Sequence, residues 1–199
     1  MTKLIFRYSY IYDLTIANWL GEKWQDKYAK RGFKYVKEIQ KRWNRINDQV
    51  FTVFESFGFK LPDWWLAYPV TRRGKVIPFS DPLTFNISQN WSDVFSTLIH
   101  ELAHVEFTYF ENEKLTEKIF RHIKKAFPNE KRNVIVHIPV NLLQLGVMAK
   151  IFPRNYQKIL AREKSFPDLA PAWEIIEANK ERINPNNPVS SILQLRGCF

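Results

Sequence analysis

Between residues 33 and 57, apolar side chains recur at steps of three or four residues, and no other feature of the chain restricts its fold more. The residues at these steps are Val36, Ile39, Trp43, Ile46, Val50, Phe54 and Phe57. The steps match the helical turn of about 3.6 residues, so they predict one long helix with a continuous apolar face. Gly58 is a natural end for this helix. Other elements must cover such a face, and we interpret it as core packing and not as a cofactor site.

Further helices are predicted on both sides of this one. Asp13 would cap a first helix that continues to about residue 30, and Gly32 would separate it from the long helix. After the middle of the chain, apolar residues at helical spacing indicate several more helices, and Pro185 and Pro188 mark a loose tail. These later helices are expected at residues 92–107, 113–127, 139–152, 154–164 and 171–182.

A region rich in strand-forming residues lies between the helices. Residues 64–70, 75–79 and 83–87 are short β-branched or aromatic runs, separated by turn signals at Arg73-Gly74 and Asp81-Pro82. They predict a small antiparallel sheet. The expected fold class is therefore α+β, a mostly helical domain with a small sheet packed on the helix at 92–107.

The composition suits a single domain. Of the 199 residues, 45% are hydrophobic and 16% aromatic, which is enough to bury a core. We expect one domain over residues 1–199. It would have a helical N-terminal part (1–58), a central part with the sheet (59–152), and C-terminal helices with the tail (153–199).

Several features predict a cytoplasmic protein without a membrane span. The lone Cys198 cannot form an intramolecular disulfide or a cysteine-based zinc site. The first residues mix charges with tyrosines, unlike a secretory signal. The longest apolar stretch, around residues 142–152, is too short to cross a bilayer and carries Gln144 and Lys150.

The chain is strongly basic, with a formal net charge of +10. Many of the cations lie on the polar side of the long predicted helix, at Lys34, Lys37, Lys41, Arg42 and Arg45. Such a charge favours acidic partners and raises non-specific attraction to nucleic acid. A solvated helix face explains the same pattern, and a nucleic-acid surface stays an open alternative.

The sequence His100-Glu101-Leu102-Ala103-His104 lies in the second half of the helix that Ser92 would cap, with Asp93 in its first turn. Four residues advance a helix by a little over one turn, so both imidazoles project from one side and can share a metal ion. Glu101 stands beside that position and could take a proton from a zinc-bound water. Apolar neighbours predict a buried, partly dry setting. The pattern therefore predicts a zinc site with Glu101 as general base.

The run from Leu83 to His104, a strand followed by a helix with this motif, resembles the zincin superfamily of zinc metallopeptidases. The chain resembles more closely a family of uncharacterised archaeal and bacterial HExxH proteins. The resembling segments are residues 79–84, 97–102, 137–140 and 172–175. The resemblance implies a zincin-like fold and a peptidase-type activity, but no particular substrate. The longer motif HExxHxxGxxH is absent, because Phe107 and Phe110 occupy its last two places, and this argues against a metzincin.

A catalytic zinc needs a third protein ligand and an open position for water. In the resembling family a histidine heads the Pro-Val segment, and this implies His137, which precedes Pro139. Pro139 would start the next helix at its first turn. The alternative for His137 is a structural histidine that ends a buried strand at residues 134–136. Glu117 is an alternative on the following helix, although it points away from that helix's apolar face. His122 does lie on that apolar face. It could be a metal ligand, a hydrogen-bond donor to the transition state or a core histidine with its own hydrogen-bond partner.

Other polar residues near the motif have weaker claims to a role. Asp81 and Asp93 could orient a ligand imidazole, and Tyr109 or Tyr156 could stabilise an oxyanion. Each is explained equally well as an ordinary turn, helix-start, surface or core residue. Glu111 and Glu113 are interpreted as solvated residues at a helix boundary.

These observations predict a zinc metallopeptidase that uses a metal-activated water, with His100, His104 and His137 as ligands. The partner would be a protein or peptide substrate. Two alternatives remain open: a non-catalytic zinc-bound scaffold, and a protease that its basic helices recruit to nucleic acid. The substrate, the cleavage preference and the oligomeric state cannot be read from the sequence.

Overall fold

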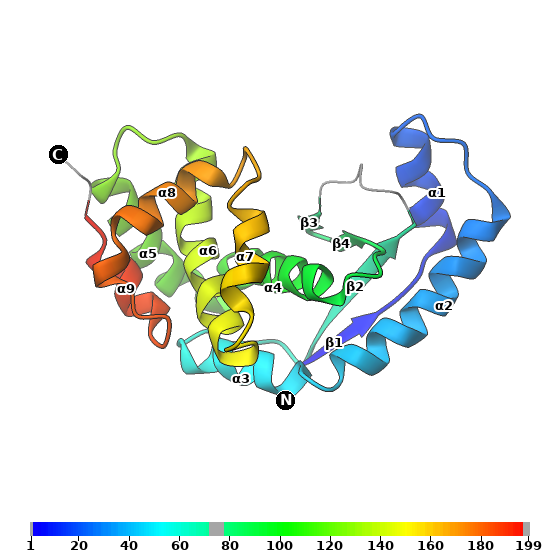
Figure 1. Ribbon diagram of the computed structural model, residues 1–199, viewed down its shortest axis with the longest axis horizontal. Coiled ribbons are helices and arrows are strands. Elements are labelled where there is room, and N and C mark those ends of the chain that lie inside the picture. Colours follow the sequence, from blue (N-terminus) through cyan, green and yellow to red (C-terminus); the bar gives the residue numbers. More distant parts are fainter. Residues whose placement is uncertain (1, 72–77, 197–199) are drawn as a thin grey trace. The chain divides into compact units, whose positions relative to one another are not determined.

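The computed structural model describes residues 2–71 and 78–196 (Figure 1). The chain forms two compact units. Unit 1 contains residues 1–51 and 61–102, and unit 2 contains residues 52–60 and 103–199. The described part is α+β, as predicted, with nine α-helices and a small four-stranded sheet.

The sheet lies in unit 1 and is mixed, not antiparallel as the turn signals suggested. Its strands are β1 (Lys3–Phe6), β2 (Trp64–Val70), β3 (Phe79–Ser80) and β4 (Leu83–Asn86), in the order β1-β2-β4-β3. β1 pairs with β2 and β2 with β4 in parallel, and only β3 runs antiparallel to its neighbour. The parallel pair β1-β2 is joined through helices, as a parallel connection requires.

β1 was not predicted, because its short run lies among polar residues. The predicted turn at Arg73-Gly74 and most of the predicted strand at 75–79 lie outside the described residues, as does Cys198.

The first helix differs from its prediction at both ends. α1 (Tyr10–Trp19) is capped by Ser9, whose hydroxyl accepts a hydrogen bond from the Tyr12 N–H. Asp13 lies inside α1 and is fully buried. Its carboxylate accepts hydrogen bonds from the Tyr8 hydroxyl at 2.7 Å and from the Thr71 hydroxyl and N–H at 2.6 and 3.0 Å. Asp13 therefore connects the start of α1 to the end of β2 instead of capping a helix.

Gly32 does not end a helix either, since it lies within α2 (Asp26–Trp43). A Cβ at this position would come within 2.2 Å of the Tyr8 ring. The glycine therefore allows a close approach between α2 and the segment after β1.

The long helix predicted at 33–57 is two helices, α2 and α3 (Asn47–Ser56). Asn47, at the start of α3, accepts hydrogen bonds from the Leu4 N–H at 3.1 Å and the Trp43 indole at 3.0 Å, and donates to the Thr2 carbonyl at 2.9 Å. A short amide side chain can satisfy backbone groups in this way where a helix is interrupted. The apolar stripe itself is core packing, as predicted, and Gly58 follows α3 with a positive φ of 92°.

Aromatic rings connect the helices of unit 1 to its sheet. Phe6 of β1 makes edge contacts with Trp43 and Phe85, at centroid distances of 6.0 and 5.8 Å. Trp43 contacts Phe95 of α4 (Trp91–Thr108) at 5.7 Å. Such contacts add specific geometry to the burial of large apolar surface.

Unit 2 is helical in its described part, and α6 (Arg132–Ile151) is its central helix. The helices around it are α5 (Glu113–Ala126), α7 (Tyr156–Glu163), α8 (Ala170–Ala178) and α9 (Pro188–Gln194), with short 3₁₀ turns at Phe110–Asn112 and Lys180–Arg182. Figure 1 shows α6, in yellow-green, beside α5, α7 and α8. α9 forms where a loose tail was predicted, because the Asn187 side chain caps it by accepting from the Ser190 N–H at 3.1 Å.

α6 starts seven residues before its predicted start, so the predicted strand at 134–136 is helical and Pro139 lies inside the helix. A proline there removes one helical hydrogen bond. Burial of Ile138, Pro139 and Val140 offsets that loss. By length and composition α6 could cross a membrane, but 61% of its apolar window is buried inside the protein, as in the core helix of a bundle.

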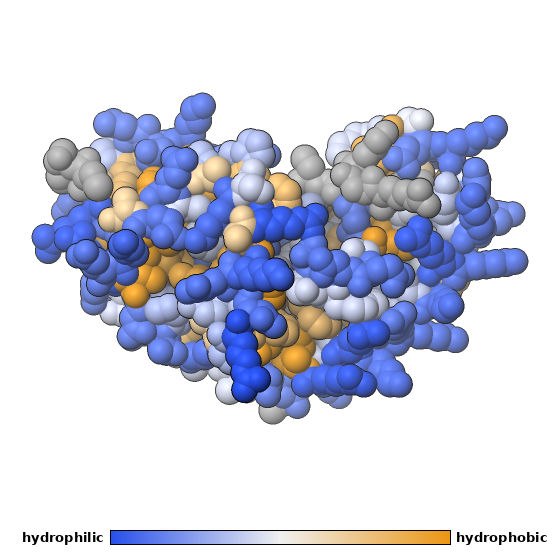
Figure 2. Space-filling view, in the orientation of Figure 1, coloured by the Kyte–Doolittle hydropathy of each residue, from blue (hydrophilic) through white to orange (hydrophobic). Residues whose placement is uncertain are grey.

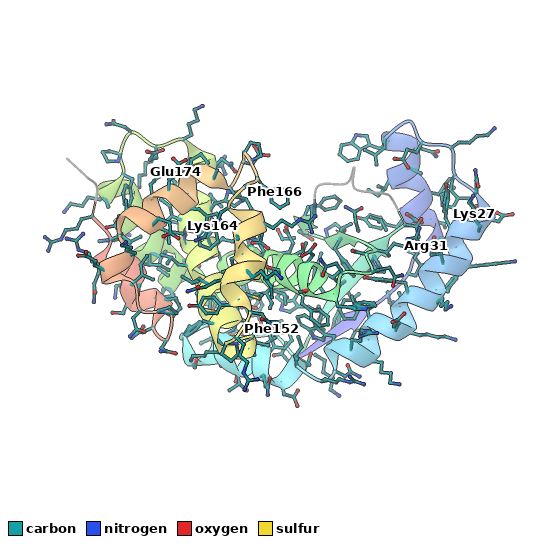
Figure 3. All side chains as sticks on the ribbon, in the orientation of Figure 1. Lys27, Arg31, Phe152, Lys164, Phe166 and Glu174 are labelled. Atoms are coloured by element: carbon teal, nitrogen blue, oxygen red, sulfur yellow. The ribbon has the colours of Figure 1, made fainter. Side chains whose placement is uncertain are left out.

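Hydrophilic side chains dominate the visible surface (Figure 2). The cations predicted on the long helix fall on α2 and just after it. Lys34, Lys37, Lys41 and Arg45 are exposed, while Arg42 is half-buried. Lys27 and Arg31 extend this basic face one turn apart on α2 (Figure 3). Arg42 instead pairs with Glu38 and lies over the Trp91 ring.

Candidate metal centre

α4 carries the HExxH motif in a closely packed apolar frame. Leu98, Ile99, Leu102 and Ala103 are fully buried, and His100 and Glu101 are only 7% and 6% exposed. The helix begins at Trp91, one residue before its predicted cap. Ser92 is inside the helix and its hydroxyl donates to the Asn90 side chain at 2.9 Å. The motif therefore stands on a regular helix in which His100 and Glu101 are buried and His104 is half-buried.

Three imidazoles converge at this helix. His100, His104 and His137 each offer one ring nitrogen, and these nitrogens lie within 4.8 Å of one another. His104 and His137 meet edge to face, with ring centroids 5.0 Å apart and an angle of 85° between the rings. His100 is one helical turn from His104 on the same continuous helix. The cluster is thus formed by two neighbouring turns of α4 and by the second turn of α6.

His137 is held in the tautomer that a metal ligand needs. Its Nδ1 lies 2.8 Å from the backbone carbonyl oxygen of Asn133, one turn earlier in α6. Because a carbonyl oxygen can only accept, Nδ1 carries the proton, and Nε2 is the nitrogen that can act as a metal ligand. Burial lowers the pKa of His137 below its ordinary value, while the Asn133 contact and the charge of Asp168 oppose that shift. The neutral imidazole, the form that binds metals, is favoured.

The two other candidates for the third ligand lie outside the cluster. Glu117 is exposed on α5 and lies 3.8 Å from the Arg121 guanidinium. The His122 ring contacts the Leu195 carbonyl oxygen at 3.2 Å. It lines a separate cavity of about 490 Å³, together with Arg182, Leu193, Gln194, Leu195 and Arg196. Among the three candidates, only His137 joins the two histidines of α4.

Surface surroundings account for Glu111 and Asp81, two of the remaining predicted residues. The Tyr109 hydroxyl donates to Glu111 at 3.2 Å, and Glu111 also lies 3.6 Å from the Lys60 ammonium. Asp81 is exposed in the turn before β4. Phe110, which occupies the last place of the longer motif, is 74% exposed.

Buried polar residues on α6 were not predicted. Asn141 and Gln144 are fully buried, four and seven residues after His137. Gln144 donates to the Glu163 carboxylate of α7 at 2.6 Å. Their only signal in the sequence is that two amide side chains interrupt an otherwise apolar run. Because the helix was predicted to begin only at residue 139, the sequence did not show that these residues share a helix face with His137.

The donor set suits a metal of intermediate softness. Neutral imidazoles are common ligands of zinc, copper, nickel and iron. A tetrahedral zinc ion with three nitrogen ligands holds those nitrogens about 3.4 Å apart. The three nitrogens all lie within 4.8 Å of one another, so at most small rotations of the rings would bring them to a common ion. Three protein ligands leave one tetrahedral position for a non-protein ligand.

Comparisons with protein-family models, with curated proteins and with solved structures find no match to this chain. The function of the chain is therefore inferred from the residues of the site.

Proposed function

We propose that this chain is a zinc-dependent peptidase of the zincin type, with His100, His104 and His137 as metal ligands and Glu101 as general base. The observation that carries the proposal is the convergence of three imidazole nitrogens within 4.8 Å beside a buried carboxylate. Hydrolysis by a metal-activated water needs a general base next to the metal, and the buried Glu101 directly follows His100 in α4.

The residues of the site would have different roles in hydrolysis. The three imidazoles would hold the ion and leave one position open. Zinc held by them would lower the pKa of a water ligand and polarise a carbonyl oxygen. Glu101 would take the proton from the attacking water and pass it to the leaving amine. Exclusion of water by the apolar residues of α4 strengthens the effect of this carboxylate.

The preference for peptide bonds rests on the resemblance of the motif to zinc metallopeptidases. The site alone would suit hydrolysis of other carbonyl compounds by the same chemistry. A panel of peptide substrates and simple esters distinguishes these substrate classes.

Metal analysis of the purified protein tests the ligand set. We expect about one zinc ion per chain in the wild type, and loss of zinc in His100→Ala and His137→Ala. Glu117→Ala is the matched control on α5 and should keep its zinc. Full zinc retention in His137→Ala would exclude His137 as a ligand.

The Glu101→Gln variant tests the role of the base. It should keep its zinc and lose peptide hydrolysis by about 10²-fold or more, because proton transfer by a placed side chain contributes about that much. If zinc stays bound and the wild type cleaves none of the panel, the non-catalytic scaffold is the better description.

A further inference from the structure

Asn141 is a buried amide without a hydrogen-bond partner. Its side chain is fully buried in α6, and neither its oxygen nor its nitrogen forms a hydrogen bond within the described part of the chain. Leaving such a group unsatisfied costs about 1–3 kcal/mol, so a buried amide without a protein partner calls for water or a ligand.

The position of Asn141 indicates where that partner lies. It follows His137 by four residues in a continuous helix, so the two side chains share one face. Long side chains in a helix lean towards its N-terminus, which for Asn141 is the direction of His137. His104 contacts His137 on this face. Asn141 therefore lies on the side of α6 that forms the histidine cluster.

Gln144, the next polar residue on this face, has a hydrogen-bond partner of its own. Gln144 donates to the Glu163 carboxylate at 2.6 Å, at the end of the face farther from His137. Asn141 lies between Gln144 and the cluster. Gln144 and Glu163 satisfy each other, so they do not serve the Asn141 amide. We therefore place the missing partner of Asn141 on the side of His137.

We propose that the Asn141 amide donates a hydrogen bond to the oxygen that occupies the open position of the histidine cluster, either a water or a substrate carbonyl. This inference rests on the proposed function. The three imidazoles and the Glu101 carboxylate all offer electron pairs, so that set lacks an N–H group for an oxygen with developing negative charge. The Asn141 amide supplies one, and Asn141 is a positioning residue for that oxygen.

The test compares wild type, Asn141→Leu and Trp173→Phe, each loaded with cobalt(II) in place of zinc. Leu has the same number of side-chain heavy atoms in the same branched arrangement and no polar atoms. Trp173→Phe is the matched control, because the Trp173 indole N–H in α8 is also buried and has no hydrogen-bond partner among the described residues. The readouts are the metal content of each protein and the absorption spectrum of the cobalt proteins as a function of pH, which reports the pKa of the bound water.

We expect Asn141→Leu to keep its metal while the pKa of the bound water rises by about one, a tenfold change, because a hydrogen bond to the hydroxide is lost. Trp173→Phe should leave that pKa unchanged. An unchanged pKa in Asn141→Leu overturns the inference and leaves the proposed function intact. A wild type that binds neither zinc nor cobalt overturns both.

A measurement on the wild type covers the case in which Asn141→Leu fails to fold. The side-chain amide of Asn141 is followed by NMR in the zinc-loaded protein as acetohydroxamate, an oxygen-donor probe for metals, is added. A shift of that resonance on addition of the probe supports the inference, and an unmoved resonance with the probe bound contradicts it.

Discussion

At the scale of single residues, burial selects the protonation states on which the proposed chemistry depends. The carbonyl of Asn133 holds the proton of His137 on Nδ1, and burial lowers the pKa of the same ring. Both effects present a neutral Nε2 to the cluster. His137 therefore needs neither a change of tautomer nor the loss of a proton at neutral pH before it can bind a metal.

Burial acts on Tyr35 in the opposite direction. It raises the pKa of Tyr35 to about 12, and the hydrogen bond from the Ser88 N–H opposes the rise. The unfolded chain releases this proton near pH 10, so it binds fewer protons than the folded protein between about pH 10 and 12. The contribution to stability is therefore complete below pH 10 and is lost as the pH rises through that window.

We expect the free energy of unfolding to fall more steeply with pH in the wild type than in Tyr35→Phe, by about 1 kcal/mol between pH 9 and 11. Urea unfolding at both pH values measures it. Tyr10→Phe, at an exposed position of the same unit, is the control and should retain the wild-type slope. Equal slopes for wild type and Tyr35→Phe would contradict the prediction.

At the scale of elements, polar side chains decide where helices are interrupted. The apolar stripe continues from α2 into α3, and its spacing gives no sign of a break. The break lies at Asn47, because its side-chain amide forms hydrogen bonds with the backbone at β1 and with the Trp43 indole at the same time. This side chain therefore joins two helices to the edge strand of the sheet.

Asn47→Ala should lower the free energy of unfolding by about 3 kcal/mol or more, because it leaves three buried polar groups without their partner. Asn44→Ala is a matched control at an exposed position, where the Asn44 side chain accepts one hydrogen bond from Gln40. It should change stability by less than about 0.5 kcal/mol. Urea unfolding of both variants makes the comparison, and similar losses would show that Asn47 has no special role.

At the scale of the whole molecule, the histidine cluster joins helices that are far apart in the sequence. His104 of α4 and His137 of α6 belong to unit 2, and α5 lies between them in the chain. An ion bound by both would close this loop, and because metal binds the folded protein only, it would stabilise unit 2 by mass action.

We therefore expect zinc to raise the stability of the wild type by about 4 kcal/mol when its free concentration is about a thousand times the Kd. Thermal unfolding with zinc, with a chelator and with magnesium measures the effect. Magnesium should have none, since it prefers oxygen ligands. The zinc effect should disappear in His104→Ala, and its persistence there would place the ion elsewhere.

Patterns that depend on neighbours along the chain could be predicted from the sequence. The spacing of His100 and His104 is set by one helical turn, and the burial of the stripe follows from its period. The positions of β2, β4 and α5 were close to prediction for the same reason, since apolar runs and breakers act locally. The ends of helices were predicted less accurately. Capping depends on which side chain can reach a backbone N–H of the first helical turn, and the tertiary structure decides this.

The partners of these elements were decided only by the tertiary structure. The turn signals suggested an antiparallel sheet, whereas β1 pairs in parallel with a strand about sixty residues later. Residues 134–136 read as a strand, yet packing against four other helices keeps α6 helical through Pro139. Local preference is weak beside the burial of a central helix. The HExxH helix was therefore determined by the sequence itself, and the approach of His137 to it by long-range packing.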